Sequence, residues 1–118
     1  MGKGGKLVEM SFDHSPSVEK EVKRIEKAGS KIMRGRVDGG LNLTRSIGDF
    51  KYKKKENIKP EEQPITANPD VFEYKLTDDT DFILIGCDGI WEGVSCQKMV
   101  FELYHELAMQ LGLDEATE

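Results

Sequence analysis

The sequence contains no long apolar segment and no strong excess of positive charge. No apolar run approaches the roughly 20 residues that span a bilayer, and the first residues lack the apolar stretch of a signal peptide. Acidic residues outnumber basic residues, 22 to 17, and the net charge of -5 is spread along the chain. These absences predict a protein that binds neither a membrane nor a nucleic acid.

Cysteine is also scarce, with two residues in a chain of 118, which is one domain's worth at most. Cys87 and Cys96 cannot form a disulfide framework and are typical of a reducing compartment. They therefore predict an intracellular protein, cytoplasmic or nuclear. Cys87 lies in an apolar stretch without a nearby histidine, so we expect it to be a buried packing residue rather than a nucleophile.

The most informative stretch is the apolar run at residues 82–85, which follows an acidic turn at residues 77–81 and ends shortly before Asp88. The run is too short for a helix and too apolar for an exposed strand, so it predicts a strand buried on both faces. Asp88 would then be held rigidly and partly dehydrated, which suits a ligand for a hard metal ion. An Asp-Gly pair after a strand is equally typical of a hairpin turn, so the residues alone leave both interpretations open.

The first third of the chain alternates strand and helix patterns. Alternating polarity predicts a half-buried strand at residues 7–12. Apolar residues at helical spacing then predict a helix over residues 18–28, capped by Ser15 or Ser17 and ended by Gly29. We expect this helix to lie on a sheet.

The middle of the chain is predominantly extended. Residues 32–37 and 41–43 predict a hairpin with its turn at residues 38–40. Charged and turn-forming residues predict a surface loop at residues 51–64, and residues 71–76 predict a strand.

The C-terminal part reads as one amphipathic helix. Ser95 can cap it, and its apolar stripe contains Met99, Val100, Leu103, Leu107 and Leu111. The helix is expected to end near Gly112, and the acidic tail at residues 113–118 is expected to fray.

Residues 84–92 and 42–50 resemble two signature blocks of the metal-dependent Ser/Thr protein phosphatases of the 2C type. The pieces that agree with the family in order and spacing lie at residues 13–17, 24–29, 35–41 and 68–71. The resemblance extends from about Gly5 to about Leu107. It implies an α+β fold, part of an α/β/β/α sandwich in which helices flank an antiparallel β-sandwich. Residues 1–118 would form one incomplete domain of this type.

The resemblance also implies an activity and assigns residues to it. Family members hydrolyse phosphoserine and phosphothreonine with water that two Mg²⁺ or Mn²⁺ ions activate. Asp88 matches a metal ligand of the family, and Glu92 stands where the family usually has a second Asp, at an additional metal position. Arg36 and Arg45 fall in or near a flap beside the family's active site, where an arginine would meet an incoming phosphoprotein. From the residues alone, they equally fit solvated side chains.

Several blocks of the family are missing from this sequence. These are the Arg and Glu of the first strands, the Asp-Gly-His-Gly segment with the bridging carboxylate, and the C-terminal Asp-Asn block. Met1 corresponds to the middle of the family domain. Because Mg²⁺ needs several oxygen ligands, we expect the chain alone to be a poor phosphatase or none.

Three accounts fit this pattern: part of a split or longer phosphatase, a fragment, or a truncated relative that acts as a non-catalytic interaction or structural subunit. In any of them, half a sandwich would leave strand edges and an apolar sheet face uncovered. This predicts a dimer or a partner protein over the exposed sheet.

Overall fold

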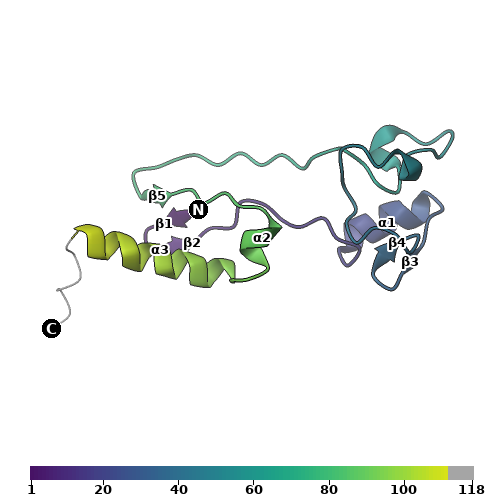
Figure 1. Ribbon diagram of the computed structural model, residues 1–118. Coiled ribbons are helices and arrows are strands. Elements are labelled where there is room, and N and C mark those ends of the chain that lie inside the picture. The colour runs from purple at the N-terminus through teal and green to yellow at the C-terminus, as the bar shows by residue number, and fades with distance from the viewer. Residues whose placement is uncertain (112–118) are drawn as a thin grey trace. The chain divides into compact units, whose positions relative to one another are not determined.

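The computed structural model describes residues 1–111 and divides the chain into two compact units. The first unit combines Met1–Ser11 with the chain from Glu73 onward, and the second is Phe12–Phe72. Each unit combines helices with a small antiparallel sheet (Figure 1), which confirms the expected α+β class. Within residues 1–111, no helix has both the length and the apolar content needed to cross a membrane.

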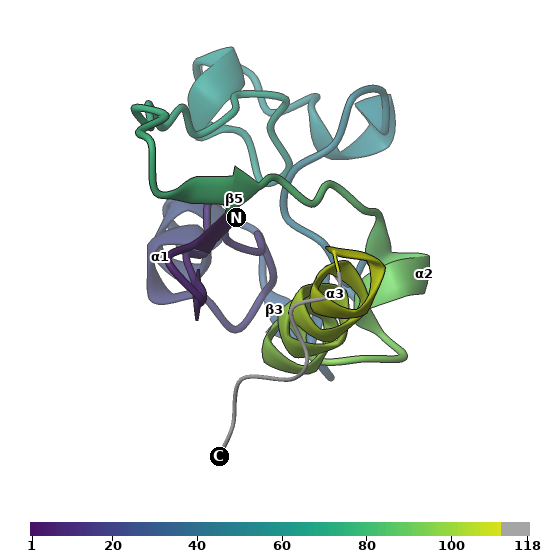
Figure 2. The same cartoon turned by 90° about the vertical axis from the view of Figure 1, so that its left-hand side faces the viewer.

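The first unit is built on a three-stranded antiparallel sheet in the order β2-β1-β5. The central strand β1 (Gly2–Lys3) pairs with β2 (Lys6–Leu7) on one side and with β5 (Thr80–Phe82) on the other (Figure 2). The amino group of Met1 donates a hydrogen bond to the carbonyl oxygen of Val8 at 2.9 Å. The N-terminal end of the chain is therefore held into this sheet.

Two helices follow the sheet in the first unit, α2 (Asp88–Trp91) and α3 (Cys96–Leu111). Helix α3 packs beside the strands (Figures 1 and 2), where the ring of its Tyr104 lies 5.0 Å from that of Phe82. Val100 is the buried residue of the expected apolar stripe, whereas Leu107 and Leu111 are exposed. Gly112 and residues 113–118 lie outside the described residues, so the expected helix end and frayed tail stay predictions.

The N-terminus of α3 confirms the expected cap. The backbone N–H of Lys98 donates to Ser95 Oγ at 3.3 Å, which satisfies one of the amides that a helix start leaves unpaired. The substitution Ser95→Ala is expected to destabilise α3 by about 1 kcal/mol. Amide hydrogen exchange of the first turn measures this effect, with Ser11→Ala as a control in the same unit; equal protection in both variants would contradict the cap.

Three strands expected from the sequence are shorter than predicted or absent. Residues 7–12 contribute only Leu7 to β2, and residues 71–76 lie outside the described strands. The apolar run at residues 82–85 is not a doubly buried strand, because β5 ends at Phe82 and Ile85 is 89% exposed. Strand pairing requires neighbours, and β5 has only β1 beside it among the described residues.

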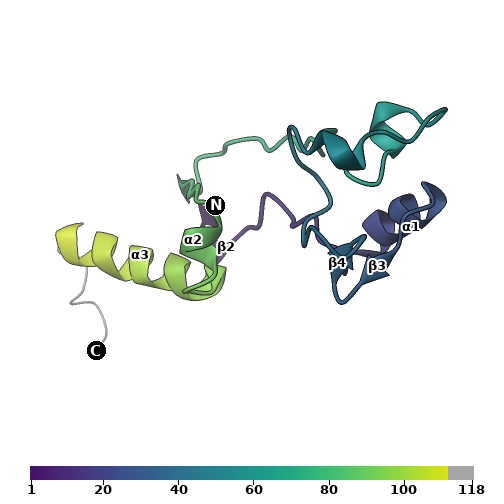
Figure 3. The same cartoon turned by 45° about the vertical axis from the view of Figure 1, so that its right-hand side comes forward.

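The second unit packs helix α1 (Glu19–Lys27) against a hairpin of β3 (Ile32–Met33) and β4 (Arg36–Val37), as Figures 1 and 3 show. Its core consists of the fully buried Ile25 and Val37 together with Ile65. This confirms the expected helix on a sheet.

The expected capping of α1 is wrong in detail. Val18 occupies the N-cap position without a side-chain hydrogen bond, while Ser15 Oγ and Ser17 Oγ bond each other at 2.6 Å. The helix ends as predicted, with the amide of Gly29 donating to the carbonyl of Glu26 and with a positive φ of 74° at Gly29.

The predicted hairpin is confirmed only in part, because the predicted turn forms but residues 32–37 are not one strand. The turn between the two strands lies at Arg34 and Gly35, and residues 38–40 form a second turn that closes an isolated bridge between Val37 and Leu41. Both Arg34 and Gly35 have positive φ, 53° and 70°, the geometry of a two-residue turn that matches the twist of a hairpin.

The range expected to be a surface loop, residues 51–64, contains most of η1 (Phe50–Tyr52) and all of η2 (Pro60–Glu62). Most of its side chains are exposed or half-buried, but Gln63 and Pro64 at its end are buried. The Gln63 amide closes the loop, because it accepts from the N–H of Lys55 at 3.1 Å and donates to the Lys55 carbonyl at 2.9 Å.

Candidate functional site

Asp88 and Glu92 lie together at α2 in the first unit. Asp88 is the first residue of the helix and Glu92 its C-cap, and the N–H of Glu92 donates to the Asp88 carbonyl at 2.8 Å. Residues four apart share one face of a helix, so both carboxylates lie on the same side of α2. Asp88 is exposed rather than partly dehydrated at a strand end, which corrects the expectation, because the preceding chain has left the sheet.

These carboxylates are the oxygen donors that Mg²⁺ and Mn²⁺ prefer. Asp88 Oδ1 accepts the N–H of Gly89 at 2.9 Å, which leaves its other oxygen open to a ligand. Within residues 1–111, no three or more acidic, histidine or cysteine side chains are grouped so that they could hold a metal ion. The pair can supply two of the ligands of a divalent cation, and a complete metal site would need more ligands than this pair.

Trp91 anchors α2 to the chain before it. Its Nε1 donates to the carbonyl of Gly86 at 2.8 Å, and its ring packs so closely that a Cβ at Gly86 would lie 2.8 Å from Trp91 Cζ2. Gly86 is therefore required for this contact. Cys87 is exposed at the N-cap position of α2, so the expectation of a buried packing residue is wrong.

Arg36 and Arg45 lie in the second unit and differ in their surroundings. Arg36 is exposed on β4, and its Nη1 donates to the carbonyl of Gly40 at 2.8 Å. The side chain of Arg45 is only 9% exposed and is surrounded by acceptors. The two arginines thus have different capacities to meet a ligand.

Arg45 is held by a carboxylate that the sequence analysis did not select. Glu21, on α1, is fully buried, and its oxygens accept from Arg45 Nη2 at 2.6 Å and from Arg24 Nη1 at 2.5 Å. The hydroxyl of Thr44 donates to Glu21 as well, at 2.7 Å. We call these four residues, Glu21, Arg24, Thr44 and Arg45, the Glu21 network.

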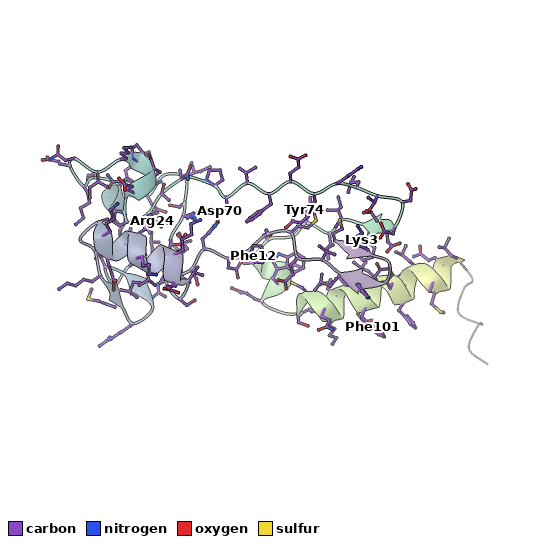
Figure 4. The ribbon with its side chains drawn as sticks, turned by 180° about the vertical axis from the view of Figure 1, so that it is seen from behind. Lys3, Phe12, Arg24, Asp70, Tyr74 and Phe101 are labelled. Atoms are coloured by element: carbon purple, nitrogen blue, oxygen red, sulfur yellow. The ribbon has the colours of Figure 1, made fainter. Side chains whose placement is uncertain are left out.

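Both guanidinium groups of the network also bond other segments. Arg45 Nη1 donates to the carbonyl of Asn68 and to Asp70 Oδ1, both at 2.9 Å. Arg24 donates through Nε to the carbonyl of Gln63 at 3.1 Å and through Nη2 to that of Thr44 at 2.7 Å. The network therefore joins α1 to the segments around Thr44, Gln63 and Asp70, which are distant from it in sequence. Arg24 and Asp70 are labelled in Figure 4.

The electrostatics of the network favour ionised carboxylates. Burial raises the pKa of the Glu21 carboxyl because desolvation disfavours the charged form. Hydrogen bonds from Arg45, Thr44 and Arg24 outweigh burial and lower this pKa from 4.5 to about 2. Glu21 is therefore a permanent anion at neutral pH.

The neighbouring Asp70 is also stabilised as an anion. Hydrogen bonds from His14, Arg45 and Lys20 hold the pKa of its carboxyl well below its usual range. His14 Nε2 lies 3.1 Å from Asp70 Oδ2, and Lys20 Nζ lies 3.1 Å from Asp70 Oδ1. Asp70 thus extends the Glu21 network toward the surface.

A sequence signal for Glu21 exists. It falls three residues after Val18 and four before Ile25, on the apolar stripe of the helix. A charged residue on an apolar stripe indicates a buried ion pair, because an unpaired buried charge is too costly. The signal does not say which cation is the partner.

A family model described as Protein phosphatase 2C matches residues 1–105. The chain belongs to the protein phosphatase 2C family, which confirms the resemblance seen in the sequence blocks. It is 52% identical over 101 residues to Protein phosphatase 1G of Homo sapiens, covering 85% of this chain and 18% of that protein. It is 41% identical over 118 residues to Probable protein phosphatase 2C 11 of Oryza sativa subsp. japonica, covering 100% of this chain and 33% of that protein.

A solved structure is also similar, the crystal structure of a phosphatase from a pathogenic strain of Toxoplasma gondii. The TM-score is 0.54 at 46% sequence identity, covering 57% of this chain and 21% of that chain. The chain thus spans about a fifth to a third of the length of these relatives. It corresponds to part of the family's domain.

Proposed function

We propose that this chain contributes one part of a Mg²⁺- or Mn²⁺-dependent protein serine/threonine phosphatase, with Asp88 as a metal ligand and Glu92 as a second one. The observation that carries the proposal is the match to the protein phosphatase 2C family over residues 1–105, together with two exposed carboxylates on one face of α2. When bound in a complete site, such ions lower the pKa of a coordinated water and neutralise phosphate oxygens.

The two carboxylates alone supply fewer oxygens than the six or more ligands that these cations take. The missing ligands would come from a segment that supplies the rest of the family's domain. On this proposal, the chain binds a divalent cation weakly and releases little or no phosphate by itself.

Arg36 is the better of the two candidate arginines for contact with a phosphoprotein. Its side chain is exposed and its guanidinium donates one hydrogen bond, to the carbonyl of Gly40, whereas the guanidinium of Arg45 is bonded to Glu21, Asn68 and Asp70. Arginine binds phosphate oxygens through parallel N–H groups, which requires free donors. We therefore assign substrate binding to Arg36. Arg45 instead holds together the segments of the second unit that it contacts.

The metal proposal can be tested residue by residue with Mn²⁺. Added Mn²⁺ is expected to broaden the amide NMR signals around Asp88 through its paramagnetism, and calorimetry is expected to give weak binding, on the order of millimolar. The substitution Asp88→Ala is expected to reduce the affinity at least about tenfold, because it removes a ligand. Asp78→Ala, which removes an exposed aspartate of the same unit, is the matched control.

Hydrolysis of a phosphopeptide is measured on the same samples. Equal Mn²⁺ affinities of Asp88→Ala and Asp78→Ala would contradict the assignment of Asp88. Tight Mn²⁺ binding with phosphate release, both lost in Asp88→Ala, would instead show that the chain needs no ligands from another segment.

A second candidate function is a non-catalytic, phosphatase-like interaction subunit. Exposed apolar side chains in the first unit favour it: Ile85 is 89% exposed, and Phe101, 68% exposed, projects from α3 (Figure 4). Such residues are candidates for contact with a second copy or with a partner protein over the sheet. Sedimentation analysis tests for a second copy, because a dimer that forms through Phe101 would dissociate in Phe101→Glu.

A further inference from the structure

The β3–β4 hairpin has a buried face and an exposed face. Ile32 pairs with Val37 and packs on the core, whereas Met33 pairs with Arg36 and lies on the opposite face. Met33 is 49% exposed, although it is apolar. The hairpin therefore presents an arginine beside an apolar side chain on a base that the core holds in place.

A second arginine stands at the tip of the same hairpin. Arg34 is exposed and adopts φ 53°, a left-handed conformation that is uncommon for a residue with a long side chain. Asparagine adopts this conformation more readily, so the turn itself does not need arginine here. A residue held at a conformational cost on an exposed tip points to a role outside the fold.

Neither of these two guanidinium groups has an anionic partner among residues 1–111, where every ion pair involves other cations. The acidic residue of the hairpin, Asp38, accepts the N–H of Lys31 at 3.0 Å. The partly buried Arg24 and Arg45, by contrast, both pair with Glu21. The positive charge of this surface is thus available to a ligand.

We propose that Arg34, Arg36 and Met33, which we call the hairpin face, form a docking surface for an acidic segment of the phosphoprotein substrate. On this proposal, Arg36 binds the phosphate group. Arg34 binds carboxylates close to the phosphorylated residue and so favours substrates that contain them. Arginine suits both groups because its planar N–H donors match carboxylate and phosphate oxygens, and Met33 offers an apolar contact between them. The proposal rests on the phosphatase function proposed above.

A peptide fits this surface better than a nucleic acid does. Binding to a phosphate backbone relies on several cations spread along a groove or stripe. The hairpin face has two cations and a half-exposed methionine on a chain whose net charge is -5. A short acidic segment with an apolar residue matches that composition.

The test measures fluorescence anisotropy of labelled peptides with the full chain in EDTA, at low salt. One phosphopeptide carries acidic neighbours of the phosphoserine and the other carries neutral neighbours. The wild-type chain is expected to bind the acidic phosphopeptide roughly three- to fivefold more tightly. Arg34→Asn is expected to abolish this difference and, because asparagine suits the turn, to leave the hairpin folded.

Lys54→Asn is the matched control, since it removes an exposed cation of the same unit that is not part of the hairpin. An equal loss in Lys54→Asn, or a preference that persists in Arg34→Asn, would overturn the proposal, as would equally tight binding of a single-stranded RNA of the same length. Because EDTA removes divalent ions, a failure of Mn²⁺ binding at Asp88 does not alter this result. Conversely, intact Mn²⁺ binding without a preference for the acidic peptide would overturn the hairpin proposal alone.

Discussion

The substitution Glu21→Gln is expected to lower the free energy of unfolding of the second unit by about 3 kcal/mol. Glu21 is fully buried and is the shared anion of two guanidinium groups that are themselves 13% and 9% exposed. Glutamine keeps the shape of the side chain but removes the charge, so Arg24 and Arg45 would remain in a dry site with one anion fewer. Breaking a buried ion pair by removing one partner costs more than the pair itself contributes.

Glu19→Gln is the control for this experiment, because Glu19 lies on the same helix and forms an exposed pair with Lys23. Its expected effect is at most about 0.5 kcal/mol. Amide hydrogen exchange of α1 reports on the second unit alone. Fluorescence would not, because Trp91, which dominates it, lies in the first unit. Equal protection of α1 in the two variants would show that the Glu21 network does not stabilise the unit.

The second unit is also expected to lose stability in acid because of Glu21. Its folded pKa of about 2 lies below its ordinary value of 4.5, so the stabilisation is fully present above about pH 5 and is lost as the pH falls toward 2. The shift corresponds to roughly 3 kcal/mol at neutral pH. Asp70 acts in the same direction, because its pKa is lowered as well.

The measurement is the stability of α1 to urea from pH 7 down to pH 2, in the wild type and in Glu21→Gln. The difference between the two proteins is expected to shrink steadily below about pH 5, since protonation removes the charge that the substitution removes. A difference that stays constant from pH 7 to pH 2 would mean that Glu21 stabilises the unit by packing rather than by charge.

Local patterns located α1 and α3 well, whereas α2 was not predicted. The start of α1 lies within one residue of the expected position, and Ser95 caps α3 as predicted, because helix formation depends on contacts three or four residues apart. A hairpin was expected between residues 32–37 and 41–43, whereas the two paired strands both lie within residues 32–37 and turn at Arg34 and Gly35. The predicted turn at residues 38–40 does form, and it joins the two expected segments through a single antiparallel bridge between Val37 and Leu41.

The candidate site was predicted less completely than the helices. Asp88 and Glu92 were chosen through the family resemblance, and their common side of α2 follows from their spacing. The exposure of Ile85 and Cys87 was not foreseen, since burial on both faces requires neighbouring strands that the residues themselves do not supply. Burial of an apolar run is a property of what surrounds it.

By itself, the sequence determined the protein phosphatase 2C family, helices α1 and α3 and the two acidic residues of the candidate site, because motifs and helical periodicity are local. Only the tertiary structure decided which arginine is free and which is paired. Arg45 meets Glu21 across 24 positions and Asp70 across 25, and such contacts exist only once the chain has folded. Two of the four arginines, Arg24 and Arg45, are thus partly buried ion-pair partners and the other two, Arg34 and Arg36, are exposed cations, and only folding separates the two kinds.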